Sequence, residues 1–211
     1  RSNKNKVRGF TLIELLISMA IFIFVITIAV GALYSAQAVN TRLEQNQVIL
    51  DGVNLAVEVM SRDVRYGSLF HCETAIPNPV PATRRDCKYN DSDGGTVLIL
   101  KPTGKLTGST NQANDRIIYY VSNGAIIKNE YPYQATPRTG IQITSSDVNI
   151  DTLKFYVSGA KSSQVILPDI PDYDQPLITI IVSGTTIPIK KNVVPVSFSV
   201  QTSISSRGLD N

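Results

Sequence analysis

Residues 10–34 read FTLIELLISMAIFIFVITIAVGALY, an almost uninterrupted apolar run near the N-terminus of the sequence. Glu14 is its only charged residue, and the next one along the chain is Arg42. Roughly 20 apolar residues suffice to cross a bilayer as a helix, in which every backbone polar group is bonded internally. The stretch therefore predicts a membrane-spanning helix over residues 10–34.

Positive charge is concentrated just before this helix. Residues 1–9 contain four basic residues and no acidic one, whereas the whole chain has a net charge of +3, so residues 10–211 are close to neutral. Basic flanks stay on the cytoplasmic side of a membrane. We therefore expect a single-pass protein of the inner (cytoplasmic) membrane with its C-terminal body outside the cytoplasm. A nearly neutral body predicts no nucleic-acid partner. Because the sequence begins with Arg1 and not with Met, we expect the natural chain to begin further upstream.

Two simpler interpretations compete for the apolar stretch. The first is a secretory signal peptide, cut after Ala38, because Ala36-Gln37-Ala38 resembles a signal-peptidase site; the stretch is, however, longer than a signal core of roughly 7–15 residues. The second is an ordinary one-pass anchor. Neither interpretation explains Glu14, because a carboxylate deep in a bilayer costs about 2.5–3.5 kcal/mol. We therefore expect Glu14 to have a function and a partner.

The string Arg8-Gly9-Phe10-Thr11-Leu12-Ile13-Glu14 resembles the processing site of type IV prepilins and type II secretion pseudopilins. This resemblance implies that a prepilin peptidase cuts after Gly9. It also implies that Phe10 becomes an N-methylated N-terminus and that Glu14 is the glutamate that the family uses in assembly. One departure is the absence of the mid-segment proline found in many major pilins, since Gly31 is the only helix-breaking residue in the stretch.

Cleavage after Gly9 would create an ammonium group on Phe10, one helical turn from Glu14. The carboxylate could pair with that group in its own chain or in a neighbour that enters the fibre, which would remove most of the cost of a charge in lipid. Only one axial offset brings the two charges together. The sequence therefore predicts that Glu14 sets the register between subunits, as buried polar groups do in coiled coils.

The helix is expected to continue as an amphipathic segment over residues 35–67. No proline occurs before Pro77, and Gly67 is a suitable C-terminal stop. Polar residues cluster on a neighbouring face: Glu44, Gln47, Asp51, Glu58 and Arg62. Apolar residues recur at helical spacing and form one stripe: Val39, Leu43, Leu50, Val53, Val57, Met60 and Val64.

Residues 68–211 are predicted to form a β-rich head. Residues 68–95 are rich in Pro, Asn, Asp and Gly and are expected to be a long surface loop. Asn123-Gly124 between two strand-like runs predicts a tight hairpin, and Pro195 predicts that regular pairing of the last strand begins only after it. The expected strands are Thr96–Leu100, Arg116–Val121, Ala125–Tyr131, Leu153–Val157, Leu177–Val182 and Val193–Ser203.

Together these elements predict an α+β fold, in which a long N-terminal α-helix, transmembrane in its first half, packs on a C-terminal antiparallel β-sheet. The helix stripe from Leu43 to Val64 would cover the apolar face of the sheet. The layout resembles the J-type minor pseudopilins and the W-type minor pilins. This resemblance implies a minor subunit at or near the fibre tip, with three kinds of partner: other pilins through the N-terminal helix, the prepilin peptidase and the inner-membrane assembly platform.

Cys72 and Cys87 are the only cysteines, and both lie on the side expected to face outward, where disulfides persist. The sequence therefore favours a disulfide between them, which would contribute roughly 3 kcal/mol. Two free thiols are the alternative. A metal site with His71 is a further one, although no fourth ligand is evident.

Two acidic clusters are candidates for calcium binding. Asn90–Gly95 resembles a fragment of a calcium loop, but Tyr89 and Leu100 stand where an EF-hand has acidic ligands. The second cluster is Asp169, Asp172 and Asp174, interleaved with prolines. We interpret the first as a tight turn and the second as a solvated loop. We therefore expect no cofactor, with calcium as the alternative.

Catalysis is not expected, because His71 is the only histidine and no phosphate-binding or paired metal-ligand motif occurs. An adhesin or DNA-uptake minor pilin is the alternative to a structural subunit, with exposed loops as the ligand-binding surface. The basic pairs available for DNA are Arg84-Arg85 and Lys190-Lys191. Binding of single-stranded DNA also needs exposed aromatic side chains on which the bases can stack. We expect four tyrosines to be sheet residues and not part of such a surface: Tyr119, Tyr120, Tyr131 and Tyr133.

Overall fold

The computed structural model describes residues 10–87, 93–133, 139–160, 175–188 and 194–207, with the backbone alone at 38, 41–42, 45–46, 48 and 50. The chain forms two compact units, of which the first ends at Glu44 and the second begins at Gln45. Within the described residues, one long helix, α1 (Leu12–Tyr66), precedes eight strands. The strands are β1 (Ser68–Glu73), β2 (Val97–Lys101), β3 (Arg116–Ser122), β4 (Ala125–Tyr131), β5 (Ile141–Gln142), β6 (Val148–Ser158), β7 (Leu177–Thr186) and β8 (Ser197–Ser205). The predicted α+β arrangement is confirmed.

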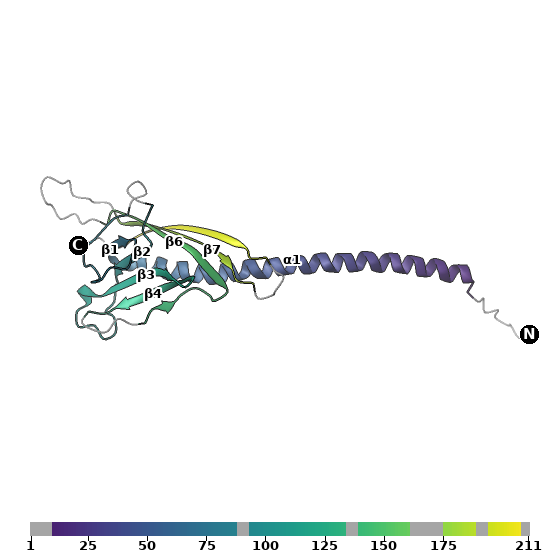
Figure 1. The fold of residues 1–211 in the computed structure, drawn as a ribbon, viewed down its shortest axis with the longest axis horizontal. Coiled ribbons are helices and arrows are strands. Elements are labelled where there is room, and N and C mark those ends of the chain that lie inside the picture. Colours follow the sequence, from purple (N-terminus) through teal and green to yellow (C-terminus); the bar gives the residue numbers. More distant parts are fainter. Residues whose placement is uncertain (1–9, 88–92, 134–138, 161–174, 189–193, 208–211) are drawn as a thin grey trace, which may run out of the picture. The chain divides into compact units, whose positions relative to one another are not determined.

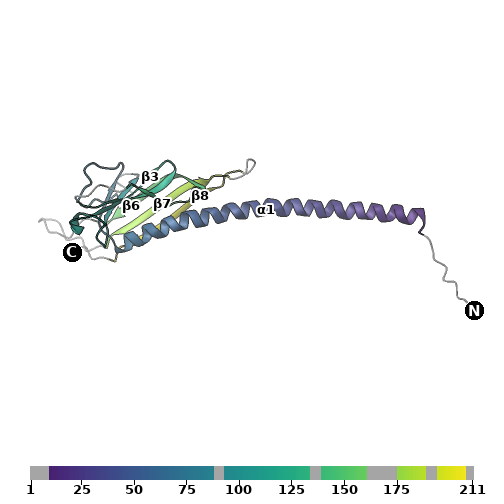
Figure 2. The same cartoon turned by 90° about the horizontal axis from the view of Figure 1, so that it is seen from below.

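The strands form two antiparallel sheets and not the single sheet that was predicted. One sheet has the order β1-β2-β3-β4-β5 and the other β6-β7-β8. Both gather around the C-terminal part of α1 (Figure 1), and β6, β7 and β8 run side by side (Figure 2). Isolated bridges join Cys87 to Val157 and Gly95 to Phe155 of β6, and the Ile150 N–H of β6 donates to the carbonyl of Gly124 in the β3–β4 turn. Sequence pattern marks strands but carries no information on which strands pair, so the division into two sheets was not predictable.

The hairpin between β3 and β4 confirms the Asn-Gly prediction. Ser122 pairs with Ala125, which leaves a two-residue loop. Asn123 has φ 51° and Gly124 has φ 71°. A type I′ turn needs positive φ at both positions, and its twist matches that of the strands it joins. Pairing in β8 begins at Ser197, after Pro195, as predicted.

Two strands fall where none was predicted. β1 lies inside the expected loop 68–95 and pairs with β2, with Cys72 opposite Leu98. β5 has only two residues, Ile141 and Gln142, and pairs with β4. Neither strand has a clear alternating pattern of its own. Both are held by longer neighbours, and their formation depends on pairing that is remote in sequence.

The inner face of α1 supplies the helical side of the core. Val53, Met60 and Val64 are buried, as the stripe predicted, and Ala56 is buried with them. The stripe was predicted to begin its contact at Leu43, which is wrong, because Leu43 is 53% exposed. The sheets contribute large buried side chains to the same cluster, among them Phe70, Leu98, Tyr119, Ile126, Phe155, Ile178 and Ile180.

A charged contact fastens α1 to the five-stranded sheet. Lys128 on β4 forms an ion pair with Asp63 of α1 at 2.5 Å, and both side chains are only 18% exposed. The hydroxyl of Tyr119 on β3 donates to the same carboxylate oxygen. Burial, together with the neighbouring Asp63 carboxylate, raises the pKa of Tyr119 well above its ordinary value of 10.0, so the phenol stays neutral and remains a donor.

Replacement of Asp63 by alanine should lower the free energy of unfolding by about 2–3 kcal/mol, because it leaves the Lys128 ammonium half-enclosed without its counter-charge. Thermal and denaturant unfolding of the purified full chain in detergent measures the effect. Glu58→Ala is the matched control, since Glu58 lies on the exposed side of the same helix and should change stability by less than about 0.5 kcal/mol. Equal losses in both variants would contradict an anchoring role.

Candidate functional site

The start of α1 is held by reciprocal hydrogen bonds between Thr11 and Glu14. The Thr11 N–H and hydroxyl donate to Glu14 Oε2 at 3.1 Å and 3.0 Å, and the Glu14 N–H donates to Thr11 Oγ1 at 3.4 Å. The first helical bond follows, from the Leu15 N–H to the Thr11 carbonyl at 3.3 Å. This is a capping box, which satisfies backbone donors that the first turn of a helix leaves without partners.

The capping role of Glu14 was missed in the sequence, although Thr-x-x-Glu before an apolar run is its signature. Glu14 therefore has a function within its own chain, in addition to the predicted one between subunits. The predicted pairing with the Phe10 amine stays a prediction, because that amine exists only after cleavage and Gly9 lies outside the described residues. Phe10 itself is 82% exposed, directly before the capping box.

The helix that follows is apolar over its whole circumference. Leu12–Gln37 has a mean hydropathy of 2.8 over its most apolar window, none of it buried, and is long enough to cross a membrane. Its hydroxyl groups bond within the helix, from Ser18 to the Glu14 carbonyl at 2.7 Å and from Thr27 to the Ile23 carbonyl at 2.8 Å. These bonds remove the cost of two polar groups in an apolar environment.

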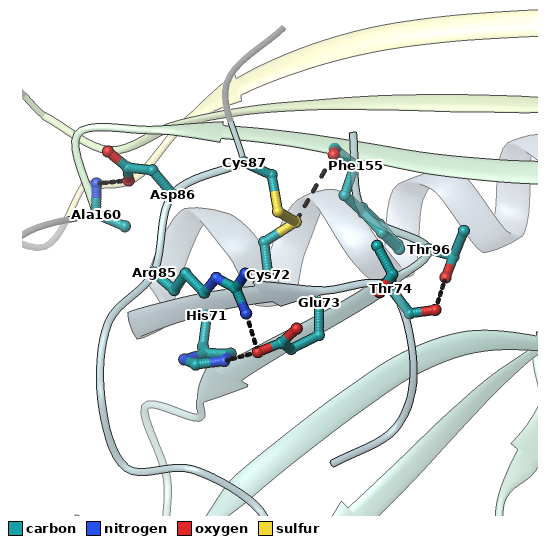
Figure 3. The surroundings of a disulfide bond; sticks show 10 residues. All are labelled: His71, Cys72, Glu73, Thr74, Arg85, Asp86, Cys87, Thr96, Phe155 and Ala160. Carbon is teal, nitrogen blue, oxygen red and sulfur yellow. Dashed lines mark hydrogen bonds and ion pairs between the residues drawn. A yellow bond between two sulfur atoms is a disulfide. The ribbon is translucent and has the colours of Figure 1, made fainter. Parts of the chain in front are cut away.

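In the second unit, a disulfide joins Cys72 on β1 to Cys87 (Figure 3). Both cysteines are buried, and the predicted bond is confirmed, so the free-thiol and metal-ligand alternatives are wrong. The Cys87 N–H donates to the carbonyl of Val157 on β6, and the Val157 N–H donates back, both at 3.0 Å. The disulfide therefore connects the edge of one sheet to the other sheet.

Gly95 packs directly against this disulfide. A Cβ added to Gly95 would lie 2.3 Å from Cys72 Sγ and 2.8 Å from the Glu73 carbonyl oxygen. Gly95 also exchanges two backbone hydrogen bonds with Phe155, at 2.8 Å and 2.9 Å. A side chain at this position would push apart β1, the disulfide and β6. Nothing in the sequence distinguishes Gly95 from an ordinary turn glycine, so its role was missed.

A polar cluster of His71, Glu73 and Arg85 lies on the side of β1 away from the disulfide (Figure 3). Glu73 contacts both His71, whose Nε2 lies 3.1 Å from Glu73 Oε1, and the Arg85 guanidinium. Burial raises the pKa of Glu73, but the hydrogen bonds from His71 and Arg85 outweigh it and leave the pKa below its ordinary value of 4.5. His71 Nδ1 lies 2.8 Å from the Thr83 carbonyl. The cluster thus clamps the segment around residues 83–85 onto β1.

The structure describes only part of the two acidic clusters that were considered for calcium binding. Within the described ranges, no three His, Cys, Asp or Glu side chains gather into a metal site. Of the Asn90–Gly95 turn, residues 90–92 lie outside those ranges, and Asp93 forms an ion pair with Lys154. The acidic cluster of Asp169, Asp172 and Asp174 also lies outside them, so calcium binding stays a hypothesis.

The structure places most of the tyrosines considered for DNA binding in or beside the β3–β4 pair. Tyr119 is buried in the core beneath α1, and Tyr120 and Tyr131 are half-buried sheet residues, as predicted. Tyr133 follows β4 and is not a sheet residue. Lys190-Lys191 lies outside the described residues.

Comparison with known families identifies one feature of the chain. Residues 4–30 match the prokaryotic N-terminal methylation motif. This range contains three of the four basic residues before the helix, Gly9, Phe10, the capping box and most of the apolar helix. Comparisons with curated proteins and with solved structures gave no significant match.

Replacement of Gly95 by alanine should destabilise the head by roughly 1–3 kcal/mol, because the added methyl group would clash with backbone and disulfide atoms that cannot move aside without disturbing the fold. It should also slow formation of the disulfide. Unfolding of the full chain and titration of free thiols measure the two effects. Gly104→Ala is the matched control, since a Cβ at Gly104 meets nothing within 4 Å. If the Gly95→Ala chain is as stable as the Gly104→Ala chain and has no free thiol, the close packing at Gly95 is not needed for the fold.

Proposed function

Because this chain carries the N-terminal segment of a prepilin-type protein, we propose that it is a structural subunit of a type IV pilus or type II secretion pseudopilus. In this proposal it is cut after Gly9, N-methylated on Phe10 and assembled through α1. The observation that carries the proposal is the coincidence of the methylation motif over residues 4–30 with a capped, apolar helix.

The physical properties of the two units support a division of labour. The first unit offers apolar side chains on all sides, which lipid would cover before assembly and neighbouring helices would cover afterwards. The second unit has a closed core, a buried disulfide and the Asp63–Lys128 anchor. A fibre subunit needs both, because the head must keep its shape while the helix changes its surroundings.

We place the protein in the inner membrane before assembly, with its head outside the cytoplasm. The basic residues before the apolar helix and the disulfide both favour this orientation, since disulfides persist in oxidising compartments. The prepilin peptidase, the assembly platform and other pilins would be its partners. The long connection between β1 and β2 favours a minor subunit of the J-type or W-type, at or near the fibre tip. We assign the protein no catalytic role.

Processing is tested by the intact mass and N-terminal fragmentation of the chain recovered from its native membrane. We expect a chain that begins at methylated Phe10. A chain that begins at Val39 would identify a secreted domain instead, and a chain that retains residues 1–9 would contradict processing by the peptidase.

The two roles of Glu14 can be separated by substitution. Glu14→Gln keeps an oxygen that can accept the capping hydrogen bonds but removes the charge, whereas Thr11→Ala removes the capping hydroxyl and keeps the charge. We expect all of these variants, and Glu14→Leu as well, to be cut and inserted into the membrane. The amount of Glu14→Gln or Glu14→Leu chain in fibres should be at least about tenfold lower than normal, because the Phe10 ammonium would lose its counter-charge. Fibre recovery followed by immunoblotting measures incorporation.

Thr11→Ala should enter fibres at close to the normal level. Poor incorporation of Thr11→Ala together with normal incorporation of Glu14→Gln would assign Glu14 to helix capping alone. In that case the charge would have no role in subunit register.

A further inference from the structure

β8 is the outer strand of the three-stranded sheet, and among the described strands it pairs with β7 alone. The Ser206 N–H donates to the Pro176 carbonyl at 3.0 Å, and the Thr186 N–H donates to the Val196 carbonyl at 2.9 Å. Because hydrogen-bonded positions alternate along an antiparallel pair, the even-numbered residues of β8 bond to β7. The odd-numbered residues turn their N–H and C=O groups away from β7, and we name them the open row: Ser197, Ser199, Gln201, Ser203 and Ser205.

The open row is uncovered on both faces of the sheet. In the part of the chain that the structure describes, no backbone hydrogen bond reaches its outward N–H and C=O groups. All five of its side chains are exposed, whereas the residues on the same face of β7, from Thr179 to Thr185, are half-buried. On the core side, Val200 of β8 is only half-buried, whereas Val182, its partner in β7, is buried. A further strand beside β8 would cover both faces.

The other strand edges of the head are covered or short. On β1, the Cys72 N–H donates to the Arg85 carbonyl at 3.2 Å, and the Arg85 N–H donates to the Phe70 carbonyl at 3.1 Å. On β6, isolated bridges from Cys87 and Gly95 occupy the side that faces away from β7. The edge strand β5 has two residues. Among the described strands, β8 thus has the one long open edge.

β8 also lacks the features that protect an open edge. Proteins commonly protect such edges with lysine, proline or a β-bulge. β8 contains no charged residue and no proline, and its pairing with β7 has no register shift. Its nine residues exceed the usual strand length of about five or six. An edge of this kind suits strand addition, in which backbone hydrogen bonds supply affinity and alternate side chains supply selectivity.

The open row extends along the side of the head. At the C-terminal end of β8, the Ser206 hydroxyl donates to the carbonyl of Gly67, directly after α1, at 3.2 Å. Strand pairing brings the N-terminal end of β8 level with Asn149 of β6. The neighbouring Val148 lies 3.7 Å from a Cβ placed on Gly52 of α1. β8 therefore runs alongside the last turns of α1, so its edge faces sideways and not toward the far end of the helix.

We propose that the open row binds an extended strand of a different subunit of the same fibre, which adds to the three-stranded sheet beside β8. The inference rests on the proposed function, because subunits anchored through parallel N-terminal helices stand with the sides of their heads toward one another. The row is uncharged, so a charged residue opposite it would lose water without gaining a counter-charge. The added strand therefore has small uncharged side chains on that face and apolar side chains beside Phe198 and Val200.

A second copy of this chain does not fit as the partner. Its β1 and β6 edges are covered and β5 has two residues, so among the described strands it could offer only its own β8. Two identical edges pair around a two-fold axis, and such a contact closes a dimer and cannot extend a fibre. The added strand therefore belongs to a different chain.

Photo-crosslinking of the full-length chain in its native membrane and fibres tests the strand addition. The photoreactive amino acid p-benzoylphenylalanine is placed at Ser197, Ser199 or Gln201 in turn, and mass spectrometry locates the residue that it attaches to. We expect one partner chain, with attachment points that move along it in steps of two residues, because alternate residues of a strand share a face. Ile141 of β5, which is 60% exposed on the other sheet, is the control position and should not reach that segment.

Proline in the open row separates strand addition from other contacts. Gln201→Pro removes an N–H that points away from β7, so it should change the Tm by less than about 3 °C. It should lower the crosslink from Ser197 at least about tenfold, because the added strand loses a donor. Gln201→Thr keeps the N–H and should lower that crosslink by less than about twofold. Ser199→Pro, with the photoreactive residue at Gln201, repeats the test at a second position.

The outcomes distinguish this contact from the proposed function. Attachment points without two-residue steps, attachment to a second copy, or an undiminished crosslink in a proline variant of normal Tm overturn the strand addition. If both proline variants lose stability, the steps along the partner of the otherwise unaltered chain decide the question. Fibres whose subunits begin at methylated Phe10 but give no crosslink overturn the strand addition and leave the proposed function intact. A chain that stays unprocessed and never enters fibres overturns both.

Discussion

The head depends on the burial of one face of α1 against side chains of both sheets. The buried residues of this face are Val53, Ala56, Met60 and Val64. Each sheet has an apolar face that neither sheet alone could hide from water. The same helix continues toward its N-terminus as a segment with no buried residue. The N-terminal part of α1 is apolar on all sides and suits a membrane, whereas its C-terminal part is apolar on one side and suits the core of the head. This change sets where the head can begin.

Two further contacts add directional bonds to this packing. Asp63 accepts from Lys128 and Tyr119 and so ties the helix to the five-stranded sheet by directional bonds. The disulfide between Cys72 and Cys87 links the edge of that sheet to β6 through backbone bonds at Val157. The Asp63 contacts thus hold the helix on one sheet, and the disulfide holds the edge of that sheet beside the other.

Features that depend on residues close in sequence were predictable. The Asn123-Gly124 turn, the amphipathic period of α1 and the disulfide between the only two cysteines all follow from local chemistry. The capping box was equally local, since Thr11 and Glu14 are three residues apart, and it was overlooked because Glu14 was considered only as a charge in lipid. β1 and β5 were missed for a different reason. Their pairing partners, and not their own residues, make them strands.

The character of the N-terminal segment could be recognised without a structure. A basic segment, a Gly-Phe step, a glutamate four residues further on and a long apolar run are all local features. The sequence also indicated that a β-rich head follows. Three features emerge only when the chain is folded: the division of the head into two sheets, the lack of space for a side chain at Gly95 beside the disulfide, and the ion pair between Asp63 and Lys128. These contacts join residues tens of positions apart. Their formation depends on how the whole chain minimises exposed apolar surface, a property that no local pattern contains.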